Sequence, residues 1–342
     1  GAVGGDPKLG LEVLAPIRPE HIAQTRRLLA AGICKMELLA GTANLHIIIT
    51  AIRGKESAAV EILNEHTNIV RMLKNGAPVF QKPQDRLAEE SNGSDMSLAE
   101  IFHFANSVDM PDVEEIIGRQ VVYNSRIAEE GLQNDYGARV GRTLLETFGD
   151  DIRTRARAYA AAGSDARMGG CTLPVVINSG SGNQGMTVSL PVIQYAHFLH
   201  APKELLYRAL VMSNLTAIHQ KMGIGRLSAY CGAVSAATGS AAGIAYINGG
   251  GLELIAKTVI NTLANVSGIV CDGAKPSCAA KIASAVDAAL IGYHMALKDR
   301  VFHSGEGIVK DSVEETISSV CKLGREGMRQ TDNKILEIMV GL

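Results

Sequence analysis

One alanine- and glycine-rich segment, residues 229–245, constrains the fold more than any other part of the chain. Ten of its 17 residues are Ala or Gly. Gly232, Ala236, Gly239 and Gly243 recur at helical spacing, so a helix here has one smooth face. Each glycine weakens a helix by about 0.8–1 kcal/mol relative to alanine, so close packing against another helix has to offset that loss. The segment therefore predicts a central, buried helix.

The composition fits a core of closely packed helices. The chain has 342 residues, which suggests two domains, and 46% of them are hydrophobic, with 8 Tyr, 6 Phe and no Trp. A core with few large rings is packed from small aliphatic side chains. No uninterrupted run reaches the roughly 18 apolar residues typical of a membrane span, so we expect no membrane partner.

Charge and cysteine content narrow the class of protein further. Lys and Arg total 33 against 35 Asp and Glu, so there is no basic surplus and we expect no nucleic-acid partner. Six cysteines without a secretory signal indicate a reduced, cytoplasmic protein rather than a disulfide framework. The opening Gly1–Gly5 segment predicts that the chain begins inside a longer protein.

The pattern along the chain predicts two domains of different class. Residues 1–82 are expected to form a small α+β domain, incomplete at its N-terminus, in which hairpins make an antiparallel sheet beside a helix. Asn75-Gly76 is the strongest hairpin signal in it. Residues 83–96 are polar and predict a linker, and residues 97–342 predict an all-helical domain. The elements expected in the first domain are a helix at 20–31 and strands at 33–39, 45–52, 58–63 and 67–73.

The helical half is interrupted by three polar, glycine-punctuated segments, which we predict to be loops. They are residues 163–170, 178–185 and 271–278. Ser97 and Glu100 have the spacing of a capping box at the start of the first helix. The helices expected in this half are 100–107, 113–130, 141–162, 202–220, 228–248, 252–265, 278–297 and 309–339.

The segment at 178–185 favours anion binding. Glycines let backbone N–H groups approach a bound anion, and the Ser, Asn and Gln side chains between them add further polar groups. No Gly-Lys-Ser/Thr follows, so it is not a P-loop. A flexible surface turn is the alternative interpretation.

The segment at 271–278 carries two cysteines, Cys271 and Cys278, with six residues between them. A thiolate at Cys278 is favoured because it opens a predicted helix. Zinc sites prefer shorter Cys-Cys spacings, whereas two such thiolates and a third from elsewhere suit an iron–sulfur cluster with one open iron. Cys231, at the start of the alanine-rich helix, is the natural third ligand. Two buried structural cysteines are the alternative.

None of the remaining cysteines is predicted to be a metal ligand. Cys34 falls in a predicted strand and Cys321 on the last long helix, so both are expected in the core. Cys171 follows Gly170 and is expected to line the cleft without binding a metal. His66 stands at the entry to a predicted strand, where a structural histidine is the alternative to a functional one.

Several ordered motifs together resemble the family that includes the bacterial and archaeal L-cysteine desulfidases. That family is related to the α part of iron–sulfur L-serine dehydratases, and the resemblance covers the whole chain. The Gly-Cys-Thr-Glu-Pro motif of the family is absent near the N-terminus, which predicts that the N-terminal part of the family sequence is missing here. The motifs that carry the resemblance are residues 164–170, 178–185, 227–229, 271–274 with Cys278, 305–308 and 330–332.

The resemblance implies an α+β domain followed by a helical domain like the serine dehydratase α chain, and a [4Fe-4S] lyase without pyridoxal phosphate. L-cysteine would be converted to pyruvate, ammonia and sulfide. Cys231, Cys271 and Cys278 occupy the positions of the cluster ligands. L-serine dehydratase-type activity, or a catalytically inactive relative that binds a small molecule, are the alternatives.

The same reaction suggests roles for the remaining candidate residues. The expected binding partner is an amino-acid substrate, and the sequence is compatible with a homodimer. Arg167 is expected to hold the substrate carboxylate, because a guanidinium can bind two oxygens at once. The candidates for the catalytic base are His66, Lys275 and Lys281. The substrate-binding candidates are Asp165, Arg167, Ser179, Ser181, Asn183, Gln184, Thr67 and Asn68.

Overall fold

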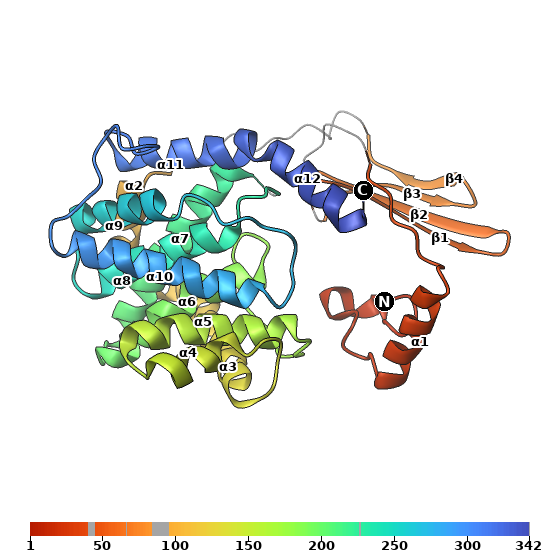
Figure 1. Ribbon diagram of the computed structural model, residues 1–342, viewed down its shortest axis with the longest axis horizontal. Helices are drawn as coiled ribbons and strands as arrows, with labels where there is room; N and C mark the ends of the chain where they lie inside the picture. Colours follow the sequence, from red (N-terminus) through yellow and green to blue (C-terminus); the bar gives the residue numbers. More distant parts are fainter. Residues whose placement is uncertain (40–44, 66, 84–95, 226, 342) are drawn as a thin grey trace. The chain divides into compact units, whose positions relative to one another are not determined.

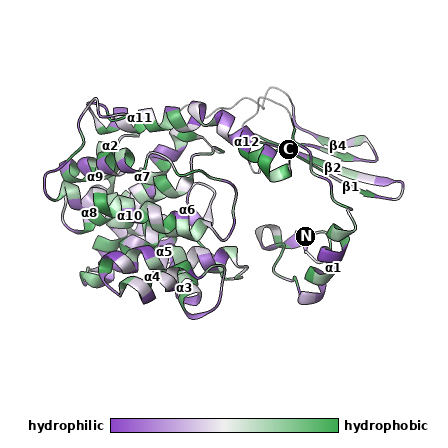
Figure 2. Cartoon of the chain, viewed as in Figure 1, coloured by the Kyte–Doolittle hydropathy of each residue, from purple (hydrophilic) through white to green (hydrophobic). Residues whose placement is uncertain are grey.

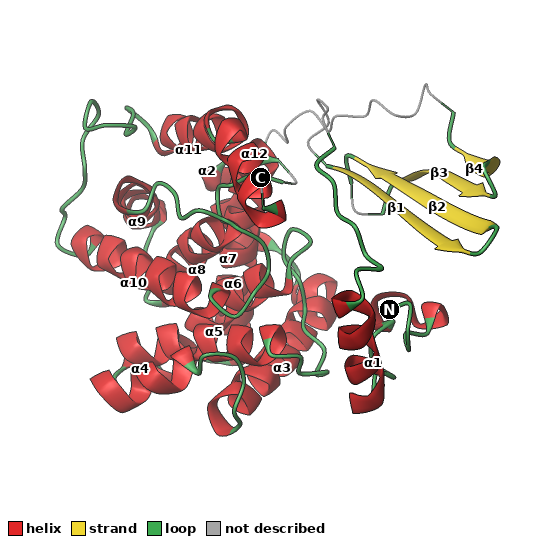
Figure 3. Cartoon of the chain, turned by 45° about the vertical axis from the view of Figure 1, so that its right-hand side comes forward, coloured by secondary structure: helices red, strands yellow, loops and turns green. Residues whose placement is uncertain are grey.

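The computed structural model describes residues 1–39, 45–65, 67–83, 96–225 and 227–341 (Figure 1). It has a four-stranded antiparallel sheet and a helix in the N-terminal part, followed by a mainly helical part (Figure 3), as predicted. By contacts the chain divides into two compact units, Gly1–Gly41 with Asn333–Leu342, and Thr42–Asp332. The predicted boundary at residue 82 stays a prediction.

The N-terminal segment is helical and ends in an extended stretch. It contains a short 3-10 helix, Pro7–Glu12, and α1, Pro19–Ala30, which confirms the predicted helix. The strand predicted at 33–39 is wrong, because within the described residues this segment pairs with no other strand and its side chains are exposed. Cys34 is likewise exposed and not in a core.

The sheet is a simple meander in the order β1-β2-β3-β4. Two-residue turns join β1 to β2 and β3 to β4, and Asn75 and Gly76 have φ of 52° and 81° in the second turn. A hairpin turn with two positive φ values favours Asn-Gly, so that prediction is confirmed. The strands are β1 (His46–Arg53), β2 (Glu56–Leu63), β3 (Ile69–Lys74) and β4 (Ala77–Gln81).

The helical part differs from the predicted elements in four places. The single helix predicted at 309–339 is wrong, because α11 begins only at Val313 and a π-helical turn, Leu323–Gly327, separates it from α12. The helix predicted at 141–162 is two, α4 and α5, because Gly149 with φ 84° ends α4 and Asp151 caps α5. Residues 163–168 continue α5 instead of forming a loop, and α6 was not predicted at all. The helices are α2 (Leu98–Ser107), α3 (Met110–Gln133), α4 (Val140–Phe148), α5 (Ile152–Met168), α6 (Gly182–Phe198), α7 (Lys203–Ile224), α8 (Gly232–Ile247), α9 (Leu252–Asn265), α10 (Cys278–Ala296), α11 (Val313–Lys322) and α12 (Arg329–Val340).

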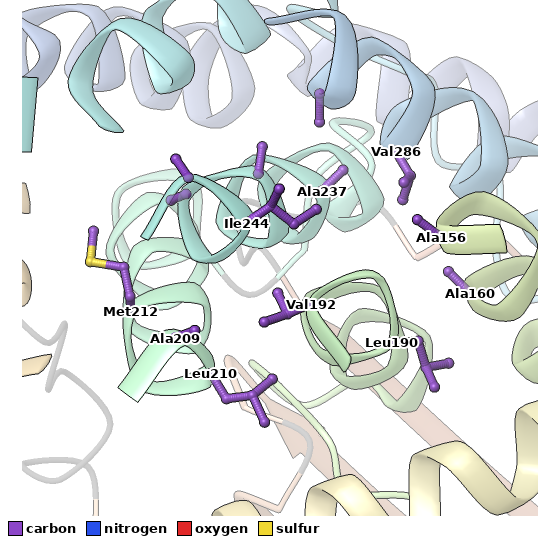
Figure 4. Packing of buried hydrophobic residues seen from close by; sticks show 14 of the residues in the cluster. Ala156, Ala160, Leu190, Val192, Ala209, Leu210, Met212, Ala237, Ile244 and Val286 are labelled. Atoms are coloured by element: carbon purple, nitrogen blue, oxygen red, sulfur yellow. The ribbon is translucent and has the colours of Figure 1, made fainter. Parts of the chain in front are cut away.

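The alanine-rich helix α8 is the centre of the helical part, as its smooth face predicts. Every residue from Ala233 to Ile247 is buried, and α6, α7, α9 and α10 pack around it. Figure 4 shows Ala237 and Ile244 of α8 among side chains such as Val192 of α6 and Met212 of α7. The outer helices α3 and α4 instead carry both hydrophobic and hydrophilic residues (Figure 2). None of the described helices has the length and apolar character to cross a membrane.

Helices α6, α8 and α10 all begin at the same end of the helical part. Gly232 of α8 contacts Gln184 of α6 and Gly243 contacts Val192, so α6 and α8 run parallel. Helix α10 lies antiparallel to α9, which in turn follows α8 through a short turn and runs back along it. The N-termini of α6, α8 and α10 and the C-terminus of α5 therefore lie together.

Candidate functional site

A short β-bridge brings two of the predicted cysteines together. Tyr230 pairs with Val270 in an isolated antiparallel bridge. The backbone N–H of Cys231 donates to the Ile269 carbonyl at 2.8 Å, and that of Cys271 donates to the Ala229 carbonyl at 2.7 Å. Residues 231 and 271 thus leave the bridge on the same face. The two cysteines lie far apart in the sequence, so their contact depends on tertiary structure and could not be predicted from the local sequence.

The two thiols interact directly. A side-chain hydrogen bond with Cys271, and burial, raise the pKa of Cys231. The same hydrogen bond lowers the pKa of Cys271 to about 6, with smaller contributions from Lys281 and Lys221. These shifts favour the proton on Cys231 and the thiolate form at Cys271. A thiolate is the form of cysteine that binds metals.

Cys278 lies near this pair at the first residue of α10. Its charge interacts with Cys231 and with Arg167. Its sulfur lies 3.6 Å from the Gly273 carbonyl oxygen and 3.5 Å from the Lys275 backbone nitrogen. The thiol is thus turned toward its own loop. Consistent with this, the described part of the chain has no group of three His, Cys, Asp or Glu side chains arranged to hold a metal ion.

The electrostatics of this end of the helical part favour negative charge. Cys231 is the N-cap of α8, Cys278 opens α10, and Ser181 is the N-cap of α6. A helix N-terminus carries roughly half a positive charge, which stabilises thiolates and bound anions. Lys221 and Lys281 add formal positive charge close to Cys271.

Arg167 is a half-buried guanidinium in this region. It comes from the last turn of α5 and packs against Gly182, where a Cβ atom would lie 2.4 Å from Nε. Burial lowers its pKa, and the nearby Cys278 opposes that shift. Within the described residues no hydrogen bond or ion pair engages the Arg167 guanidinium. Such a group is suited to an anionic ligand that the chain does not itself supply.

Two amide side chains on the first turn of α6 also have unused hydrogen-bonding capacity. Gln184 packs against Gly232, and its Oε1 is buried without a hydrogen-bond partner, as is Oδ1 of Asn183. Buried polar atoms normally have a partner, so these two indicate a missing ligand or water. The two serines before them have structural roles: Ser181 Oγ accepts from the Gln184 backbone, and Ser179 Oγ donates to Asn178.

Asp165 is fully buried and binds the backbone of a neighbouring helix. Its Oδ2 accepts a hydrogen bond from the Gly141 N–H at 3.0 Å, near the start of α4. Burial raises the pKa of this carboxyl from 3.8 to about 6, although backbone hydrogen bonds from residues 138, 140 and 141 oppose the shift. The contact fixes α4 against the turn of α5 that carries Arg167.

The raised pKa of Asp165 predicts a pH-dependent stability. The folded protein holds the proton more tightly, so this stabilisation is complete below about pH 4 and is lost as pH rises through about 6. A shift of roughly two pKa units corresponds to about 3 kcal/mol. We expect the free energy of unfolding of the wild type, relative to Asp165→Asn, to rise by about that amount from pH 7 to pH 4. Denaturant titrations across this range measure it, and a pH-independent difference contradicts it.

The two lysine candidates for the base are engaged in ion pairs. The Lys275 ammonium lies 2.6 Å from Asp272, and that of Lys281 contacts the other oxygen of the same carboxylate. These two lysines lower the pKa of Asp272 to about 2. Burial lowers the pKa of Lys281, but the hydrogen bond and charge of Asp272 outweigh it and raise the pKa overall. This arrangement favours the protonated form of Lys281, which cannot accept a proton.

The other predicted site residues belong to the sheet. Thr67 and Asn68 precede β3, and Asn68 donates to the Leu63 carbonyl and accepts from Lys82. They line a pocket of about 490 Å³ on the sheet together with Phe80. His66, the third candidate for the base, lies outside the described residues.

Cys171 lines a separate pocket of about 590 Å³ rather than the cysteine cluster. That pocket is lined also by Arg126, Glu130 and Tyr136, and by none of the three predicted ligands. The Tyr136 hydroxyl donates to Glu130 at 3.0 Å. Cys171 therefore lines a pocket that it does not share with Cys231, Cys271 or Cys278.

Two residues at the site were missed by the sequence analysis. Asn124 of α3 is fully buried and accepts from the Val176 N–H while donating to the Gly185 carbonyl, so it holds the start of α6. Ser235, one turn after Cys231, has a buried hydroxyl without a partner. The four-residue spacing of Cys231 and Ser235 is a signal that could have found the second; nothing local points to the first.

Comparison with known proteins places this arrangement in a family. Residues 8–337 match the family described as serine dehydratase alpha chain, and the chain belongs to that family. It is 54% identical to a UPF0597 protein of Lachnoclostridium phytofermentans, over 99% of this chain and 82% of that protein. It is 48% identical to a UPF0597 protein of Desulfitobacterium hafniense (99% and 80% covered) and 37% identical to one of Bacteroides fragilis (99% and 81%).

Proposed function

We propose that the protein is an iron–sulfur-dependent lyase that eliminates the β substituent of an amino acid, with L-cysteine as the substrate. The observation that carries the proposal is the Arg167 guanidinium, which has no hydrogen bond or ion pair within the described part of the chain. It lies near Cys278, at the end of the helical part where Cys231 and Cys271 meet. Membership of the serine dehydratase alpha chain family supports a lyase of this kind. The products would be pyruvate, ammonia and sulfide.

Three cysteine sulfurs are the donor set that a [4Fe-4S] cluster with one iron free of protein ligands requires. The hydrogen bond with Cys231 favours the thiolate at Cys271, and Cys278 lies nearby at the start of α10, with its sulfur 3.6 Å from the Gly273 carbonyl oxygen. These three residues would hold the cluster. When bound, it would supply a Lewis acid for the departing β substituent.

The chain's own residues would bind and orient the substrate. Arg167 would hold the α-carboxylate through two parallel N–H···O bonds, beside the positive end of α6. The buried Oε1 of Gln184 and Oδ1 of Asn183 are acceptors without partners, which suits the α-ammonium group. Because Lys275 and Lys281 are ion-paired with Asp272, His66 is the remaining candidate for the base that removes the α proton.

The proposal is tested by anaerobic reconstitution of the cluster in this chain, followed by assays with L-cysteine and L-serine. We expect a brown protein that releases sulfide and pyruvate in equal amounts from L-cysteine. Pyruvate from L-serine alone would instead support the serine dehydratase-type activity. A protein that binds an amino acid but releases no pyruvate from either would identify a catalytically inactive relative and overturn the proposal.

Replacing Arg167 by lysine tests the carboxylate contact. Lysine keeps the charge but cannot bind two carboxylate oxygens in a plane, so we expect KM for L-cysteine to rise about tenfold, the equivalent of about 1.4 kcal/mol. The visible spectrum of the cluster should not change. Arg155→Lys, on the same helix but paired with Asp150, is the matched control and should leave KM unchanged. An unaltered KM in Arg167→Lys would remove Arg167 from the site.

A further inference from the structure

Lys281 connects the start of α10 to the chain on both sides of Cys271. It lies three residues after Cys278, in the first turn of the helix. Its ammonium donates to the Val270 carbonyl at 2.8 Å and pairs with the Asp272 carboxylate. One side chain therefore joins the helix that carries Cys278 to both neighbours of Cys271.

The rest of the loop is closed around the same carboxylate. Lys275 lies 2.6 Å from the second oxygen of Asp272, and the Lys275 backbone nitrogen lies 3.5 Å from the Cys278 sulfur. Cys271 is itself anchored to the Ala229 carbonyl on the segment that leads to Cys231. The positions of all three cysteines are thus linked through one cross-connected loop.

We propose that Lys281 is a positioning residue that fixes the separation of Cys271 and Cys278 and so determines how firmly the cluster is retained. The inference rests on the proposed function for the identity of the group that the cysteines hold. It gives Lys281 a role different from that of a base. The Lys281 side chain is only 22% exposed and its ammonium already donates to two acceptors on the cysteine loop, so it acts as a tether.

The experiment compares Lys281→Met with Lys257→Met in the reconstituted full chain. Methionine keeps the length of the side chain but removes the charge and the donors. Lys257 is the matched control, because its ammonium also has two partners, the carboxylates of Glu253 and Asp299, and its side chain is similarly exposed. We expect an iron chelator to remove the cluster at least tenfold faster from Lys281→Met than from wild type, and at the wild-type rate from Lys257→Met.

A second measurement needs no cluster. Alkylation of the metal-free chain by iodoacetamide is compared under alkaline conditions, where Cys271 is ionised and losing the Lys281 charge no longer changes the fraction of thiolate. Mapped by mass spectrometry, it should modify Cys271 several-fold faster in Lys281→Met than in wild type, because the loop is no longer held by the Val270 and Asp272 contacts. Asp272→Asn weakens the same tether without changing Lys281, and it should shift both readouts in the same direction. This variant decides the inference if Lys281→Met is poorly folded. Lys281→Arg keeps the charge and donors and should restore retention of the cluster and the wild-type kcat per cluster.

The outcomes separate the inference from the proposed function. Wild-type rates of cluster loss and of alkylation in Lys281→Met overturn the positioning role. A Lys281→Arg protein that keeps its cluster but loses turnover also overturns it, because that is the behaviour of a catalytic base. If the wild-type chain takes up no cluster, the proposed function fails, and the alkylation rates still decide the inference.

Discussion

Replacing Cys271 by serine is expected to remove the iron–sulfur cluster and with it the lyase activity. The hydrogen bond within the cysteine pair favours the thiolate at Cys271. The Cys271 backbone N–H donates to the Ala229 carbonyl, and Lys281 contacts both of its neighbours in the chain. A serine hydroxyl at neutral pH is not a thiolate and does not replace it as a ligand. We expect iron content to fall to near zero and activity to fall more than about 100-fold, beyond the 10–100-fold typical of residues that only orient a ligand.

Two other cysteines provide matched controls for this loss. Cys321 is buried and its thiol donates to the Gln220 carbonyl, which confirms the predicted core position. Cys34 is exposed in the other unit. Iron and sulfide analysis of Cys321→Ser and Cys34→Ser should show an intact cluster. Full iron content in Cys271→Ser would show that Cys271 is not a ligand. Collapse of the iron content in Cys321→Ser would show that α11 contributes to the cluster site.

The parts of the fold that could be predicted from sequence are those with a local physical cause. The Asn75-Gly76 turn follows from positive φ values that few other residue pairs adopt. The buried position of α8 follows from three glycines that are unfavourable in a helix unless another helix packs against them. In both cases a few neighbouring residues contain the reason.

The missed elements depend on contacts that local sequence does not encode. Helix α6 is buried nearly throughout and contains Pro191, so it has neither a polar face nor a continuous propensity to reveal it. Residues 163–168 were predicted to be a loop from their polarity, but Ser164 and Asp165 are fully buried, and Gly163 fits against Met186. Tertiary packing overrides a weak local preference here.

Some features of the candidate site could likewise be predicted from the sequence, and others could not. Cys231 and Cys278 could be selected from their positions at predicted helix starts, and Cys271 from its place in the predicted loop before Cys278. The structure brings Cys231 and Cys271 together, with Cys278 nearby. The role of each polar side chain could not be predicted in this way, because it depends on whether the folded chain already supplies a hydrogen-bond partner for it. Asp165 has the α4 backbone as a partner, whereas Arg167 two residues later has none among the described residues.

Substituting leucine for Gly239 is expected to cause the largest loss of stability, because α8 and α7 are closest there. A Cβ atom at this position would lie 2.4 Å from the Ser213 carbonyl oxygen and 3.0 Å from Cβ of Ala217. The first contact is with backbone, which cannot rotate away, so the helices must separate. Overpacking usually costs about 1–3 kcal/mol, and we expect the free energy of unfolding to fall by at least about 3 kcal/mol.

Gly251→Leu is the control for Gly239→Leu, because no atom lies within 4 Å of a Cβ at Gly251 and its φ of −76° is ordinary. We expect this variant to lose less than about 1 kcal/mol in a denaturant titration, the cost of an unfavourable helix N-cap. Because α8 begins directly after Cys231, moving its axis should also displace that sulfur and lower the iron content of Gly239→Leu. Equal losses of stability in the two variants would mean that α7 and α8 can separate freely. Full iron content in Gly239→Leu would show that Cys231 is not a ligand whose position depends on α8.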